Sequence, residues 1–158
     1  MYEEMLEKAK GFGDIFNLVK MATNQRLGLH RAGLSLVLMD LQPNVLAQHQ
    51  IGSNAIIMDK KVLEAVNQTL ENKVERNSYV FVVLLHEYLH SFGITSEERV
   101  RTLVMDVVDF AFPGNHPAHG IALNPLSLFD EKLIIFRPSH DKPYIIKDFD
   151  RESMPYIG

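Results

Sequence analysis

The sequence predicts one α+β domain that spans residues 1–158, with helices packed on a β-sheet. Two observations lead to this prediction: several segments carry apolar residues at helical spacing, and shorter apolar segments end at turn-forming residues. A chain of 158 residues has the usual size of a single domain and can bury a core without disulfide bonds. It has no internal repeat and no low-complexity linker that would divide it.

The first part of the chain predicts two helices followed by two strands. Residues 2–10 and 14–26 have helical patterns and are separated by a Gly-Phe-Gly sequence at 11–13. The second of these segments is amphipathic, which is typical of a helix that covers a sheet. Residues 33–41 and 53–58 are short and apolar, and each predicts a strand.

The middle of the chain predicts three consecutive helices. The first covers residues 60–72, and the second begins at Asn77 or Ser78 as N-cap and runs to about Phe92. The third extends over residues 96–112 and ends before a Pro-Gly stop signal. Its apolar face repeats at the spacing of a helix packed on a core and comprises Val100, Leu103, Val104, Val107 and Ala111. We therefore expect the second and third helices to pack against each other.

The last part of the chain has weaker patterns. Residues 115–120 predict a loop that carries two histidines. Residues 132–137 and 144–149 alternate apolar and polar side chains, which predicts a hairpin or two short strands. Residues 151–158 predict a frayed tail.

The second predicted helix of the middle region contains the pattern H-E-x-x-H, formed by His86, Glu87 and His90. Positions i and i+4 lie on one face of a helix, so both imidazoles can bind one metal ion. Glu87 is suitably placed as the general base for a metal-activated water. The apolar residues 81–85 indicate a buried helix, in which these polar groups need a partner such as a metal. The alternative is a core histidine pair hydrogen-bonded to the backbone or to Glu87.

The segment H-E-Y-L-H-S-F-G, residues 86–93, resembles the active-site helix of the zincin metallopeptidases and the start of the metzincin signature. The resemblance implies a zincin-like fold, with a twisted mixed β-sheet packed on helices and the H-E-x-x-H helix at its centre. It also implies zinc-dependent hydrolysis of peptide bonds, with Gly93 allowing a sharp turn after the helix. In zincins the strand before this helix, here 53–58, is an antiparallel edge strand that binds an extended peptide. An ordinary strand of the sheet is the alternative.

The third metal ligand does not follow directly from the resemblance. Metzincins usually have His or Asp three residues after the glycine, where this chain has Ser96. Of the next two residues, Glu97 falls near the edge of the apolar face of its helix and Glu98 nearly opposite it. Thr95 and Glu98 also fit a capping box, which gives Glu98 a structural role. We therefore expect Glu97 to face inward and bind the metal. Three alternatives remain open: Glu98, His116 and His119.

Composition limits the compartment and the partners. The absence of cysteine excludes disulfide bonds and thiolate zinc sites. The acidic start lacks the features of a signal peptide, and the longest apolar run, residues 79–85, is too short to span a membrane. The net charge of −4, with both signs interspersed, argues against a nucleic-acid partner. We expect a cytoplasmic protein with a peptide or protein substrate and no membrane partner.

These observations together predict a zinc-dependent metallopeptidase, a hydrolase with Zn²⁺ as its cofactor. Its metal ligands are expected to be His86, His90 and Glu97, with Glu87 as the catalytic base. Three residues are candidates to stabilise the oxyanion, and the sequence does not rank them: Tyr144, His116 and His140. Two other functions remain open, namely a zinc-dependent hydrolase acting on a non-peptide substrate such as RNA, and a non-catalytic domain with a structural zinc site.

Overall fold

The computed structural model describes residues 1–158 except 42–44, 46, 50–52, 71, 125–142 and 152–158. The described residues form helices and a mixed sheet, which confirms the predicted combination of the two. In chain order the elements are α1 (Tyr2–Lys8), α2 (Phe12–Leu27), β1 (Ser35–Met39), β2 (Ala47–His49), β3 (Ala55–Asp59), α3 (Lys60–Thr69), α4 (Lys73–His90), α5 (Glu97–Ala111), α6 (Pro117–Leu123) and β4 (Tyr144–Ile146).

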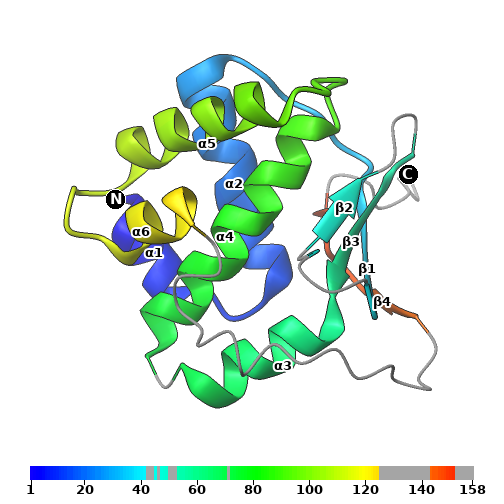
Figure 1. Ribbon diagram of the computed structural model, residues 1–158. Coiled ribbons are helices and arrows are strands. Elements are labelled where there is room, and N and C mark those ends of the chain that lie inside the picture. The colour runs from blue at the N-terminus through cyan, green and yellow to red at the C-terminus, as the bar shows by residue number, and fades with distance from the viewer. Residues whose placement is uncertain (42–44, 46, 50–52, 71, 125–142, 152–158) are drawn as a thin grey trace, which may run out of the picture.

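Helix α4 lies at the centre of the molecule, with α2, α5 and α6 around it and the sheet to one side (Figure 1). Its sequence explains this position, because every residue from Ser78 to Leu85 is buried and no polar face is left for solvent there. Its contacts with α1, α2, α5, α6, β2 and β3 join the helices to the sheet. None of the described helices is long and apolar enough to cross a membrane.

The start of α4 differs from the prediction. The helix begins at Lys73, and its N-cap is Asn72, whose Oδ1 accepts a hydrogen bond from the Val74 backbone N–H at 2.8 Å. Asn77 lies within the helix and donates from Nδ2 to the Leu6 carbonyl at 2.8 Å. The prediction of Asn77 or Ser78 as the N-cap was therefore wrong, because a contact with α1 satisfies the Asn77 side chain and the Ser78 hydroxyl donates to the Val74 carbonyl at 2.6 Å within the helix.

The sheet has the strand order β2-β3-β1-β4. Strand β3 is parallel to β1, while β2 is antiparallel to β3 and β4 is antiparallel to β1. The prediction of 53–58 as an antiparallel edge strand was therefore wrong, because β3 lies between two neighbours. Among the described residues, the antiparallel strand at that edge is β2. Only three residues long, β2 has no alternating pattern that the sequence would reveal.

Several predicted bounds and caps also change. Strand β1 is shorter than the predicted 33–41, and α2 begins two residues earlier than expected. The N-cap of α5 is Ser96, whose Oγ accepts from the Arg99 backbone N–H at 3.1 Å, so the capping box of Thr95 and Glu98 is not formed. The predicted loop at 115–120 includes the start of α6. Residues 132–137 and 152–158 lie outside the described residues.

Candidate metal centre

The last turns of α4 and the first residue of α5 bring together His86, His90 and Glu97. The Nε2 atom of His86 lies 2.9 Å from Oε2 of Glu97, and Nε2 of His90 lies 2.7 Å from Oε1. One ligand atom from each residue lies within 4.8 Å of the other two. Two imidazoles and one carboxylate form a ligand set that zinc accepts in catalytic sites. The structure thus places the three predicted ligands in one group.

The turn between the two helices positions Glu97. Gly93 has φ of +88°, a left-handed conformation that favours glycine, and it reverses the chain after α4. The Ser96 cap then starts α5, so that Glu97 is its first residue. Its side chain is 61% exposed, so the prediction that it faces the core was wrong. The Glu97 side chain instead reaches from the first turn of α5 to His86 and His90.

The hydrogen bonds of His90 determine which of its nitrogens is free to bind an ion. Its Nδ1 lies 2.7 Å from the Ile94 carbonyl oxygen, which can only accept, so Nδ1 carries the proton. In the neutral ring, Nε2 then has a lone pair that faces the carboxylate of Glu97. Two acceptors at this distance repel each other unless a proton or a cation lies between them. A shared metal ion satisfies both atoms.

The pKa shifts of His86 and Glu97 agree with metal binding. Burial is the main cause that lowers the pKa of His86, although the nearby Glu97 carboxylate acts in the opposite direction. Partial burial raises the pKa of Glu97, but His86 and His90 outweigh it and the net shift is downward. A neutral imidazole and an ionised carboxylate are the forms that bind a metal ion.

Glu87 is buried beside the group, with 6% of its surface exposed. Burial raises its pKa to about 7, the interaction with His90 opposes this shift, and the negative charge of Glu97 adds to it. A carboxyl group with a pKa near neutrality can both accept and return a proton. The structure therefore gives Glu87 the environment that a general base requires.

A cavity of about 260 Å³ lies next to the group. One wall is formed by residues of α4, the turn and α5: Glu87, His90, Ile94, Thr95 and Glu97. The other wall is strand β2, through Ala47, Gln48 and His49. The sequence did not point to β2 or to the Ile94 carbonyl, because a three-residue strand and a backbone oxygen leave no pattern of side chains.

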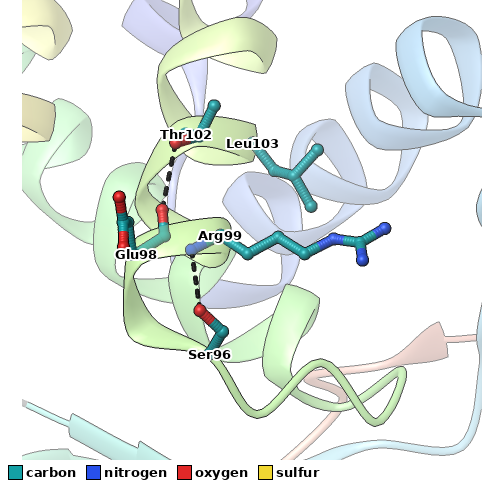
Figure 2. Close-up of a pocket in the computed structure, with 5 residues that line it drawn as sticks. All are labelled: Ser96, Glu98, Arg99, Thr102 and Leu103. Carbon is teal, nitrogen blue, oxygen red and sulfur yellow. Dashed lines mark hydrogen bonds between the residues drawn. The ribbon is translucent and has the colours of Figure 1, made fainter.

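A second depression, of about 440 Å³, lies on another face of α5 (Figure 2). Its lining residues are Ser96, Glu98, Arg99, Thr102 and Leu103. Two hydrogen bonds join lining residues along α5, from the Arg99 backbone N–H to Ser96 and from the Thr102 hydroxyl to the Glu98 carbonyl. Glu98 thus belongs to this face and is not part of the metal group.

The two alternative histidine ligands lie elsewhere. The ring of His116 is buried, stacks on Phe112 at 4.3 Å, and caps α6 by accepting from the Ala118 N–H at 3.1 Å. His119 lies 3.1 Å from a carboxylate oxygen of Asp109. Among the described residues, neither belongs to the group formed by the α4 and α5 side chains.

The proposed oxyanion donors are not brought to the site by the described structure. Tyr144 is in β4 and 58% exposed, at the other end of the strand order from β2. The His116 ring caps α6 by accepting from the Ala118 N–H, and His140 lies outside the described residues.

The candidate metal centre is accordingly assigned from the geometry of this chain. Comparison with models of protein families, with curated proteins and with solved structures finds no match to the sequence or the fold.

Proposed function

We propose that the protein is a zinc-dependent peptidase in which His86, His90 and Glu97 hold the ion. The observation that carries this proposal is the convergence of three ligand atoms within 4.8 Å beside a buried glutamate. Zinc, when bound, supplies a Lewis acid that polarises a carbonyl and makes water acidic near neutral pH.

Glu87 acts as the general base and then as the general acid. Its carboxylate accepts a proton from the water that attacks the carbonyl carbon and then donates it to the leaving nitrogen. A pKa of about 7 suits both steps, since the group is neither a strong acid nor fully ionised at neutral pH. His90 keeps its orientation through the hydrogen bond from Nδ1 to the Ile94 carbonyl.

Strand β2 supports a peptide as the substrate. It pairs with β3 along one side and forms a wall of the cavity beside Glu87 and His90. In the described part of the chain, no strand pairs with its other side. An extended peptide can add to such an edge through backbone hydrogen bonds, which places a peptide bond near the metal group.

The number of ligands supports catalysis over a structural role for the ion. A structural zinc usually has four protein ligands, whereas a catalytic zinc has three and an open position. The group has three members among the described residues, and it borders a cavity. Both features favour a site that admits a substrate.

The proposal is tested with Glu87→Gln. Zinc-loaded protein is incubated with a mixture of peptides, and the products are identified by mass spectrometry. We expect the variant to keep its zinc but to cleave at least about 100-fold more slowly, because the proton acceptor is lost. Glu98→Gln, on another face of α5, is the matched control and should cleave like the wild type. Equal cleavage by Glu87→Gln, or no cleavage by the zinc-loaded wild type, would contradict the proposal.

A further inference from the structure

Arg101 lies one helical turn after Glu97 on α5. Residues four apart share one face of a helix, so the guanidinium is on the side of α5 that carries the proposed ligand. Glu97 itself contacts His86 at 2.9 Å. Burial is the largest influence on the pKa of His86, and the positive charge of Arg101 acts in the same downward direction.

The Arg101 side chain is exposed, and among the described residues no hydrogen bond or ion pair joins its guanidinium to another side chain or to the backbone. Most other described arginines have structural partners, which are Asp106 for Arg26, Asn54 for Arg31, the Leu70 carbonyl for Arg76, and Asp14 for Arg151. Arg101 therefore has all its donors available beside the metal centre. It is not among the residues that line the β2 cavity, so it would contact a part of the substrate that extends beyond that cavity.

We propose that Arg101 binds a carboxylate of the substrate close to the bond that is cleaved. The inference rests on the proposed function and specifies its substrate as a peptide with an acidic side chain or a free C-terminus near that bond. A guanidinium has a planar pair of donors that matches both oxygens of a carboxylate. Such a contact orients the peptide and selects for its charge.

The surrounding charges favour a single carboxylate over a nucleic acid. Glu87 and Glu97 line the β2 cavity, Glu98 is exposed on another face of α5, and the whole chain has a net charge of −4. A nucleic acid presents a row of phosphates and is bound through several basic side chains. One arginine fits one carboxylate, whereas the acidic groups around it repel a longer row of negative charges.

The test measures binding to zinc-loaded protein and does not depend on turnover. Three matched succinyl hydroxamates are titrated calorimetrically: a neutral methylamide, a compound ending in a free carboxylate, and an amide that carries aspartate. The hydroxamate binds the metal in each, so only the carboxylate differs. The proteins are wild type, Arg101→Gln, Arg101→Lys and Arg99→Gln. Arg99 is the matched control, because it is also exposed on α5 but extends over the other depression (Figure 2).

We expect wild type to bind at least one acidic hydroxamate about tenfold more tightly than the neutral one. Tighter binding of the compound with the free carboxylate would indicate that Arg101 binds the C-terminus of the substrate. Tighter binding of the aspartate compound would indicate that it binds an acidic side chain. Arg101→Gln should lose the preference yet bind the neutral compound as wild type does. Arg101→Lys should retain part of it, and Arg99→Gln all of it.

Different failures separate the two proposals. Equal binding of all three hydroxamates by wild type, or a loss in Arg99→Gln as large as in Arg101→Gln, overturns the role of Arg101 alone. Failure to bind even the neutral hydroxamate overturns the metal centre and this inference together. Tighter binding of a short single-stranded RNA that also depends on Arg101 would replace the peptide carboxylate with a nucleic-acid ligand and overturn the inference.

Discussion

Individual hydrogen bonds give two histidines of this chain opposite roles. His90 donates from Nδ1 to a carbonyl, which leaves Nε2 as the acceptor that a metal requires. His116 accepts at Nδ1 from the backbone of α6, so Nε2 carries the proton in the neutral ring and is buried without a partner in the described structure. The sequence could predict the shared face of His86 and His90 from their spacing. It could not predict these bonds, because both partners are backbone groups fixed by tertiary structure.

His116 should make stability depend on pH. Burial lowers its pKa, although Glu3 opposes the shift, so the unfolded chain binds a proton more readily than the folded protein. Its contribution is therefore present above its unfolded pKa of about 6.5 and is lost as the pH falls toward the folded pKa. In His116→Asn the cap acceptor remains but the titration disappears. Urea unfolding of metal-free protein at about pH 7 and about pH 5 should show a smaller loss of stability in the variant than in wild type. An equal loss in both proteins would contradict this assignment.

Helices were easier to predict from this sequence than strands or caps. Amphipathic patterns located α2, α3 and α5, because an apolar face repeats several times in each, and the continuous apolar run located α4. The short β2 and α6 were missed, since three to seven residues carry little periodicity. The cap of α5 was misplaced by one residue, because Thr95 and Ser96 are both residue types that cap helices.

The corrected cap gives a prediction about the element that carries Glu97. Ser96→Ala removes the acceptor for the Arg99 N–H and should lower the free energy of unfolding by about 1 kcal/mol. Zinc affinity should fall by up to about fivefold, because the first turn of α5 must be ordered for Glu97 to reach the histidines. Thr95→Ala should change neither quantity appreciably. Denaturant titration and zinc competition with a chelator measure the two effects. A larger effect in Thr95→Ala would restore the originally predicted cap.

At the scale of the whole molecule, a buried ion pair ties the end of the described chain to the helices. Lys20 in α2 and Asp150 are 2.7 Å apart with side chains 5% and 0% exposed. Asp150 also accepts from the backbone N–H groups of Gly33 and Leu34, just before β1. The adjacent Phe149 stacks on Phe16 at 4.2 Å. Residues far apart in sequence thus join α2 to the segment before β1 and to the segment after β4, a long-range pairing that local patterns cannot predict.

This arrangement predicts a large effect for one substitution. Asp150→Asn leaves the buried ammonium group of Lys20 without the charge of its carboxylate and should lower stability by about 3 kcal/mol. Asp14→Asn breaks an exposed pair with Arg151 and should cost less than about 1 kcal/mol. Thermal and urea unfolding of both variants compare the two pairs directly. Similar losses in the two variants would show that burial does not determine the contribution of the Lys20 pair.

The central claim is that His86, His90 and Glu97 bind one metal ion and leave Glu87 free. The most direct measurement is metal content per chain by elemental analysis, on protein purified without added metal, for wild type, His86→Ala, Glu87→Ala and Glu97→Ala. We predict about one zinc in wild type and in Glu87→Ala, and little in the other two. A wild type that is metal-free and does not take up added zinc would contradict the claim and leave a histidine pair held by a carboxylate. Zinc retained in Glu97→Ala would contradict the assignment of the third ligand.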